Sequence, residues 1–126
     1  MNPLAIAAVG IGGALGSLLR YWFSDSWNAI MPTLPLGTLA SNLVGGYCVG
    51  VAVAFFVANP QLSPEWRLLV ITGFMGGLTT FSSFSAEAVG MFSSGLYAAG
   101  LLHTAAHLFG SFAMTALGIA SFRALA

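Results

Sequence analysis

The sequence predicts an all-α integral membrane protein in which residues 1–126 form one transmembrane domain of four helices. Hydrophobic residues fill 58% of the positions and charged residues only 5%, whereas about 25% of an average soluble domain is charged. A chain with so few charges could not keep a folded surface in water, and no nucleic-acid partner is expected. Four apolar stretches each reach the roughly 20 residues that cross a bilayer core: residues 4–23, 37–57, 68–89 and 96–122.

The first helix is expected over residues 4–23. The preceding Met1-Asn2-Pro3 carries no basic segment, and the apolar stretch is too long for the core of a signal peptide. We therefore expect this helix to be retained. Arg20 lies near its end, where the side chain either snorkels to the interface or makes the entrance of a pathway attractive to anions.

The second helix, residues 37–57, carries a cluster of polar and small residues in its first turns. Asn42 places an amide near mid-membrane, and Thr38 and Ser41 lie on neighbouring turns. Polar groups there must face protein or water, because lipid cannot satisfy them. Asn42 either donates to an anion or bonds a neighbouring helix, and for an isolated amide the second interpretation is favoured.

The third helix, residues 68–89, contains an unusual run of glycines and hydroxyls. Gly73, Gly76 and Gly77 lower helix propensity, and the hydroxyls of Thr79 and Thr80 can bond freed carbonyls. The run predicts an unwound point near the middle of the membrane, with a glycine packing site and a mild kink as the alternative. Unwound backbone at that depth must be buried in protein or line a cavity, and its carbonyls are ready ligands for a small cation.

Two phenylalanines follow the expected break. Phe81 and Phe84 are three residues apart and lie on nearly the same face, among the hydroxyls of Ser82 and Ser83. The edge of a phenyl ring is electropositive. Ring edges and hydroxyls could therefore replace part of the water around a small anion without a fixed positive charge. An isolated pair of phenyl rings, however, usually faces lipid or the protein core.

The fourth helix is expected over residues 96–122. A polar stripe of Thr104, His107, Ser111 and Thr115 follows it in steps of three and four residues. His103 precedes His107 by four residues, the spacing of a metal or haem pair. No third ligand with fitting spacing is evident, so the polar stripe is the preferred interpretation.

Glu87, toward the end of the third helix, has three open interpretations. Its carboxylate pairs with an arginine, caps a polar network or relays protons.

The charges and the polar stripes bear on assembly. In a four-helix topology Arg67 and Arg123 share the side of the N-terminus, and Arg20 lies on the other. Because Lys and Arg normally gather on the cytoplasmic side, this near balance fits either one fixed orientation or a chain that inserts both ways and pairs antiparallel with itself. The polar stripes are too extensive for one small bundle to bury, which favours a homo-oligomer.

Four segments of the chain resemble one known family, in the same order along it. The longest, residues 73–87, reads GFMGGLTTFSSFSAE and closely resembles the signature of the Fluc (CrcB) fluoride channels. The others are residues 12–16 followed by Arg20, residues 35–42 and residues 110–115. The likeness covers essentially the whole chain.

The resemblance implies a dual-topology antiparallel homodimer of four-helix subunits, with two fluoride pathways at the subunit interface. Phe81 and Phe84 would touch fluoride with their ring edges, and Asn42 would donate from the second helix. Ser82 and Ser83 would belong to a polar track along the pathway. The position of Ser83 is commonly threonine in the family, and the hydroxyl is kept here.

The resemblance also implies a structural sodium ion at the dimer centre, held by the backbone carbonyls of Gly76 and Thr79 from both subunits. Arg20 would lie toward an aqueous vestibule. His103 lies where the family has a hydrogen-bonding side chain of variable type, and it is assigned to the pathway on that basis. His107 and Glu87 are left without an assigned role.

The expected function is a fluoride-selective channel that passively exports fluoride across the bacterial inner membrane and lowers its concentration in the cytoplasm, without enzymatic activity. Without the resemblance, the residues predict only a small oligomeric membrane protein with an interfacial pathway for an anion. A small multidrug transporter, which exchanges protons for cations, is the alternative. That class needs an acid deep in the first helix, and residues 4–21 contain none.

Overall fold

The structure, a computed structural model, describes residues 1–126 and contains helices but no strands. Four helical spans are long and apolar enough to cross a membrane, as the composition predicts. The first, second and fourth spans are single helices: α1 (Pro3–Trp27), α2 (Leu36–Ala58) and α6 (Tyr97–Leu125). Each of these three runs past at least one end of the apolar stretch that marks it in the sequence.

The third span, Pro64–Ser93, is not one regular helix. Its first half is a continuous rod that changes from α to π geometry and back, and its second half is a separate α-helix. The four parts are α3 (Pro64–Arg67), η1 (Leu68–Met75), α4 (Gly76–Leu78) and α5 (Ser82–Ser93).

Local signals explain where several helices begin and end. The Asn2 side chain caps α1, since its Oδ1 accepts the Ala5 N–H at 2.7 Å, and Pro3 follows at the first helical position. Proline is favoured there because its missing N–H would have no helical partner anyway. Gly95 turns the chain between α5 and α6 with φ of +79°, a left-handed conformation that glycine adopts without strain.

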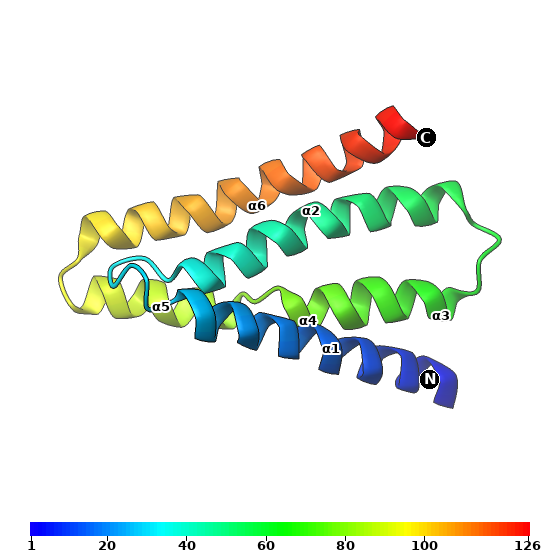
Figure 1. Cartoon of the computed structure of the whole chain (residues 1–126), viewed down its shortest axis with the longest axis horizontal. Helices are drawn as coiled ribbons and strands as arrows, with labels where there is room; N and C mark the ends of the chain where they lie inside the picture. The colour runs from blue at the N-terminus through cyan, green and yellow to red at the C-terminus, as the bar shows by residue number, and fades with distance from the viewer.

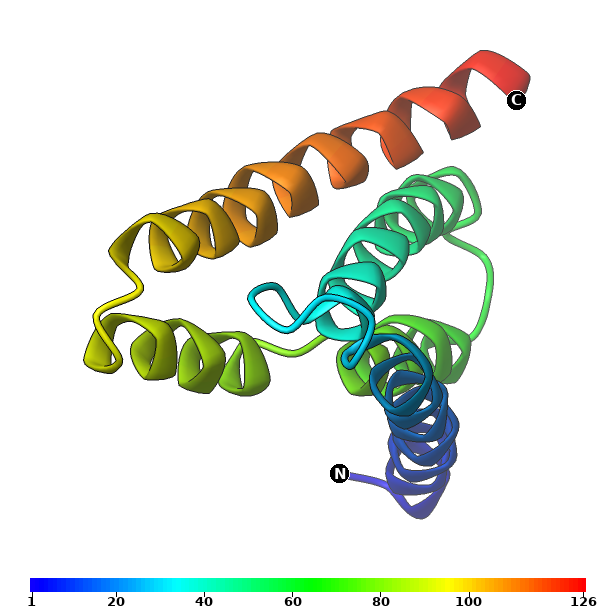
Figure 2. The same ribbon diagram turned by 60° about the vertical axis from the view of Figure 1, so that its left-hand side comes forward.

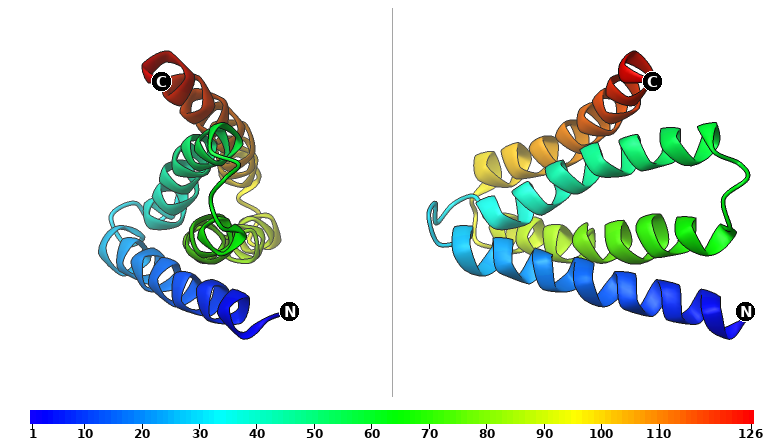
Figure 3. Two further views of the ribbon diagram at one scale, coloured as in Figure 1. Left: turned by 90° about the vertical axis from the view of Figure 1, so that its right-hand side faces the viewer. Right: turned by 45° about the vertical axis from the view of Figure 1, so that its right-hand side comes forward.

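The spans form two packed pairs. The first half of the third span packs along α1, and α6 packs along α2, with α1 and α2 also in contact. Both termini lie at the same end of the bundle, together with the connection between α2 and α3 (Figures 1 and 3). Beyond the break, α5 turns away from α1 and lies beside the start of α6 (Figure 2).

Glycines bring α1 into backbone contact with the third span. A Cβ added to Gly12 would lie 2.9 Å from the Phe74 nitrogen, and one added to Gly77 would lie 2.5 Å from the Gly13 oxygen. On the other pair, a Cβ on Gly118 would lie 3.0 Å from the Val51 nitrogen. These distances leave no room for a methyl group, so the small residues at these positions permit close helix contacts.

The predicted break is present, but it lies after the glycines rather than at them. Gly73 and Gly77 are helical and face α1, whereas the helix stops at Thr79, which is extended with φ of −83° and ψ of 155°. The N–H and the hydroxyl of Thr79 both donate to the Met75 carbonyl, at 2.9 and 2.8 Å. Gly73 and Gly77 therefore serve packing against α1, and the Thr79 hydroxyl closes the helix end.

Candidate functional site

A cleft of about 420 Å³ opens where the broken third span meets α2 and α6. Its walls come from α2, from the break together with α5, and from α6, so three separate stretches of the sequence meet there. The lining residues are Asn42, Thr79, Thr80, Phe81, Phe84, His107, Leu108, Ser111 and Phe112.

The two phenyl rings of the sequence motif lie together at this cleft. Phe81 and Phe84 have ring centroids 5.5 Å apart and planes inclined by 80°, so the edge of one ring meets the face of the other. Phe84 is also stacked on the imidazole of His107, with centroids 4.6 Å apart. Phe81 is 77% exposed and Phe112 across the cleft is 65% exposed, which leaves ring edges free for a ligand or a second subunit.

Asn42 clasps the unwound backbone. Its Oδ1 accepts the Thr80 N–H at 2.7 Å, and its Nδ2 donates to the Thr80 carbonyl at 3.0 Å. This pair of bonds replaces the helical partners that Thr80 loses at the break. The favoured interpretation of an isolated amide, a bond to a neighbouring helix, therefore describes Asn42 in this structure.

These two hydrogen bonds between Asn42 and Thr80, the clasp, also fix the tautomer of His107. Because Thr80 sets which end of the Asn42 amide is the oxygen, the second amide proton of Nδ2 points to His107 Nδ1, 2.8 Å away. The Nδ1 atom must therefore accept, and in a neutral imidazole the proton then resides on Nε2. Asn42 thus connects the break to the fourth span.

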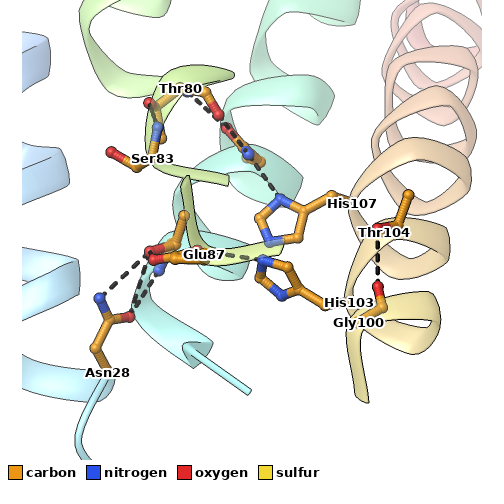
Figure 4. A network of polar contacts seen from close by, with 10 residues as sticks. Asn28, Thr80, Ser83, Glu87, Gly100, His103, Thr104 and His107 are labelled. Carbon is orange, nitrogen blue, oxygen red and sulfur yellow. Dashed lines mark hydrogen bonds and ion pairs between the residues drawn. The ribbon is translucent and has the colours of Figure 1, made fainter. Parts of the chain in front are cut away.

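Glu87 lies at the centre of a second polar group, below Thr80 in the view of Figure 4. Its Oε2 accepts the Thr38 hydroxyl at 2.7 Å, and its Oε1 lies 3.2 Å from Nε2 of His103. Asn28, at the end of α1, donates to Thr38 Oγ1 at 3.3 Å and accepts the Thr38 N–H at 3.0 Å. The carboxylate therefore caps a polar network, one of the three roles that the sequence leaves open.

A third potential metal ligand, which the sequence spacing does not reveal, lies beside the two histidines. One ligand atom each from Glu87, His103 and His107 lies within 4.8 Å of the others. Sequence spacing shows only the two histidines, four residues apart on one helix. It gives no sign of Glu87, because the rotation of α5 after the break decides which way the carboxylate points.

Arg20 does not line the cleft. Its Nε donates to the Gly77 carbonyl at 2.9 Å, a carbonyl left without its helical partner because the helix ends at Leu78. The guanidinium therefore caps the broken helix from α1. In the resolved arrangement its charge acts first on the protein backbone.

Two carbonyls at the break have no partner in the chain. The N–H groups that would reach Gly76 and Thr79 in a continuous helix, those of Thr80 and Ser83, donate instead to Asn42 Oδ1 and to Thr80 Oγ1. No other backbone or side-chain donor reaches either oxygen. Gly76 is exposed and Thr79 is partly exposed in the single subunit.

The predicted site residues fall into two groups. Asn42, Phe81 and Phe84 meet at the cleft, whereas four others lie outside its lining: Arg20, Ser82, Ser83 and His103. His103 is fully buried behind His107, which takes the lining position on α6. The pathway roles assigned to these residues stay predictions.

Sequence reasoning did not single out every lining residue. Leu108 and Phe112 follow His107 and Ser111 by one residue on α6, so the polar stripe carries an adjacent apolar stripe. The sequence shows this apolar stripe next to the polar one, and both could have been predicted to line a pathway.

The lining suits an anion better than a cation. It contains an amide, hydroxyls and phenyl edges, and no carboxylate. Amide and hydroxyl protons and the electropositive rims of aromatic rings are attracted to negative charge. No full positive charge lines the cleft, so an anion held there would be bound weakly enough to leave, as passage requires.

Comparison with known proteins places the whole chain in one family. Residues 7–119 match the family model described as CrcB-like protein, Camphor Resistance (CrcB). The chain is 60% identical to a protein of Cupriavidus metallidurans, with 100% of each chain covered. It is 57% identical to one of Cupriavidus pinatubonensis, again with 100% of each chain covered.

A more distant relative gives the same result. A protein of Nitrosospira multiformis is 52% identical, with 100% of this chain and 98% of the relative covered. All three relatives carry the name fluoride-specific ion channel FluC. Since the family model and the relatives span the cleft, the break and all four spans, this chain belongs to the CrcB-like protein family.

Proposed function

We propose that this chain is a fluoride-specific ion channel that lets fluoride leave the bacterial cell passively through the inner membrane. The observation that carries the proposal is the meeting of Phe81 and Phe84 with Asn42 and Ser111 at one cleft beside a broken membrane span. The relatives named fluoride-specific channels support the choice of ion. The proposal assigns the chain no enzymatic activity.

Fluoride is small and strongly hydrated, so a channel must replace much of its water. Phenyl edges and the Ser111 hydroxyl offer partial positive charge from several directions. Both amide protons of Asn42 are already bonded, to Thr80 and to His107. An ion reaching Asn42 would take the proton now given to His107, while the two bonds to Thr80 keep the break in place.

We further propose that two copies pair antiparallel and close the cleft. Phe81 and Phe112 are 77% and 65% exposed in a single subunit, so the cleft is open on one side. The basic residues support insertion in both directions, because Arg67 and Arg123 lie near one end and Arg20 toward the other. A second copy in the opposite orientation would cover the same face and create two equivalent pathways.

Dual topology has a direct test. In a Cys48→Ser chain, Gln61→Cys places a single thiol in the short connection between α2 and α3. A membrane-impermeant thiol reagent applied to intact cells should then label half of the molecules, and the rest should react only after permeabilisation. Labelling of all or none before permeabilisation would show one fixed orientation.

The free carbonyls of Gly76 and Thr79 support a structural sodium ion at the centre of the dimer. Carbonyl oxygens are suitable ligands for a hard cation, and those of both subunits would complete the set. The positive charge would stabilise the ends of the two broken helices, where carbonyls gather. Sodium removal should weaken the dimer, and Thr79→Val should not, because it keeps the carbonyl and removes only the hydroxyl.

Ion efflux decides between this function and the multidrug alternative. Proteoliposomes are loaded with potassium fluoride or potassium chloride. Valinomycin then makes the membrane permeable to potassium, so that anions can leave, and each anion is followed with a selective electrode. Rapid fluoride efflux with little chloride efflux is expected. Equal efflux of both anions, no efflux of either, or proton-coupled uptake of a lipophilic cation would contradict the proposal.

A further inference from the structure

We propose that Glu87, His103 and His107 form a binding site for a divalent transition-metal ion of the zinc type. One nitrogen or oxygen atom of each side chain lies within 4.8 Å of the other two. The three residues come from α5 and from two successive turns of α6, as Figure 4 shows.

The first support is a set of buried polar atoms without partners. His103 is 0% exposed and His107 is 3% exposed. Neither nitrogen of His103 has a hydrogen-bond partner, nor do His107 Nε2 and Glu87 Oε1. Buried polar atoms in folded proteins are nearly always paired. His103 Nε2 and Glu87 Oε1 lie 3.2 Å apart and can pair with each other, but His103 Nδ1 and His107 Nε2 have no such neighbour and indicate a partner that the chain itself does not supply.

The second support is the spacing. Zinc binds imidazole nitrogen at about 2.0–2.1 Å and carboxylate oxygen at about 2.0–2.2 Å in a tetrahedral arrangement. Two ligand atoms on such a site are therefore about 3.4 Å apart. His103 Nε2 and Glu87 Oε1 are already 3.2 Å apart, and the ligand atoms of all three residues lie within 4.8 Å of one another.

The donor set defines the class of ion. Two imidazoles and one carboxylate suit zinc, cobalt, nickel or copper, whereas magnesium and calcium prefer sites made of oxygen alone. The carboxylate would repel an anion, and it lacks a full positive partner in the chain. Three protein ligands leave a fourth position open, as in zinc sites that hold water or a small anion.

Metal binding would be coupled to the cleft through Asn42. The Asn42 amide now donates to His107 Nδ1, so the ring proton is on Nε2. A metal on Nε2 displaces that proton and requires one on Nδ1, where the amide can no longer donate. The Asn42–His107 bond and the bound metal therefore exclude each other, and an occupied site should inhibit ion flux.

Metal binding can be measured without any transport assay. The full chain, with its affinity tag removed, is titrated with Co²⁺ in detergent, and tetrahedral coordination is followed by its visible absorption. Zn²⁺ should then displace Co²⁺ and bleach the signal. The chain has only two histidines and one cysteine, so few other soft ligands compete.

Single substitutions identify the ligands. His103→Gln, His107→Gln and Glu87→Gln should each weaken cobalt binding by about 100-fold or more, since loss of even an outer partner weakens metal sites by 10–100-fold. Cys48→Ser and Glu65→Gln remove a thiol and a carboxylate elsewhere and should bind as the unchanged protein does. No cobalt absorption at millimolar metal, or equal binding by all variants, would overturn the site.

The coupling is tested by adding Zn²⁺ to the fluoride-efflux assay, and this part rests on the proposed function. Efflux through the unchanged chain should fall, and the flux that remains in His103→Gln should not respond to zinc. Bound cobalt with zinc-insensitive flux would overturn the coupling through Asn42. If the chain carries no fluoride at all, the proposed function fails, and the cobalt titration still decides the metal site.

Discussion

The two halves of the third span differ sharply, although both belong to one glycine- and hydroxyl-rich run. Before the break, η1 and α4 lie against α1 with backbone touching backbone at Gly12, Gly16 and Gly77. After it, α5 turns toward α6, and its Phe81 and Phe84 line an open cleft. One half has no space for a methyl group, and the other has a cleft of about 420 Å³.

The difference separates two uses of small and polar residues in a membrane. In the first half glycine permits close approach, and the hydrogen bonds stay within the helix. In the second half the Asn42 amide and the Thr80 hydroxyl take over the hydrogen bonds that the broken helix gives up. Asn42 and Arg20 join the halves, because each bonds a carbonyl of the break from another span.

The largest loss of stability is expected from adding a side chain where the first half of the third span packs closely on α1. In Gly16→Ala the new methyl group would collide with backbone of Phe74 and lie 2.8 Å from the Leu78 nitrogen. Overpacking of this kind costs about 1–3 kcal/mol. Unfolding in SDS titrations should therefore begin earlier than in the unchanged protein.

Gly10→Ala is the matched control on the same helix, since nothing lies within 4 Å of its added methyl group. It should leave unfolding unchanged or slightly delayed. Equal destabilisation by both substitutions would show that helix packing does not distinguish these glycines, and the comparison between the two halves would lose its basis.

The next effect is expected at the clasp between the halves. Asn42→Ala removes both bonds to Thr80 and leaves buried backbone groups unpaired, which costs about 1–3 kcal/mol. Both stability and fluoride flux should fall. Asn59→Ala removes one amide bond at the exposed end of the same helix and should change stability by less than about 0.5 kcal/mol. Similar values for the two would contradict the clasp.

A selective effect on flux is expected in the open half. Phe81→Ile keeps an apolar side chain but removes the ring edge, and Phe81 is 77% exposed, so packing within the subunit loses little. Fluoride efflux should fall by about tenfold or more, which corresponds to about 1.4 kcal/mol. Phe109→Ile, outside the cleft lining, should conduct normally. Normal flux in Phe81→Ile would remove the ring edges from the mechanism.

The smallest effect is expected at Arg20. Arg20→Lys keeps the charge and loses the Nε that caps the Gly77 carbonyl at 2.9 Å. The expected loss is about 0.5–1.5 kcal/mol of stability, with fluoride flux nearly unchanged at low salt. A large fall in flux with unchanged stability would instead indicate that the guanidinium acts directly on the ion.

Much of the fold was predictable because membrane helices leave strong local signals. Hydropathy marks four spans, and the run from Gly73 to Glu87 marks a break. The position of the break was less predictable, since glycine lowers helix propensity in isolation but is stabilised in a helix by the contact with α1. Helix propensity says nothing about that contact.

The site was predictable only in part, because the break resets the rotation of everything after it. Phe81 and Phe84 share a face by spacing alone, and they meet as expected. The sequence did not predict that Glu87 approaches His103, or that His107 rather than His103 lines the cleft. Both features depend on how α5 and α6 are rotated toward each other. No sequence period fixes that rotation.

The central claim is that ring edges of the open half touch fluoride. Solid-state fluorine-19 NMR on the protein in bilayers, with ring-¹³C phenylalanine, measures that contact through space. Dephasing of the bound fluoride signal by ring carbons, and its reduction in Phe81→Ile but not in Phe109→Ile, is the predicted result. A bound fluoride signal that the ring carbons do not dephase would contradict the account.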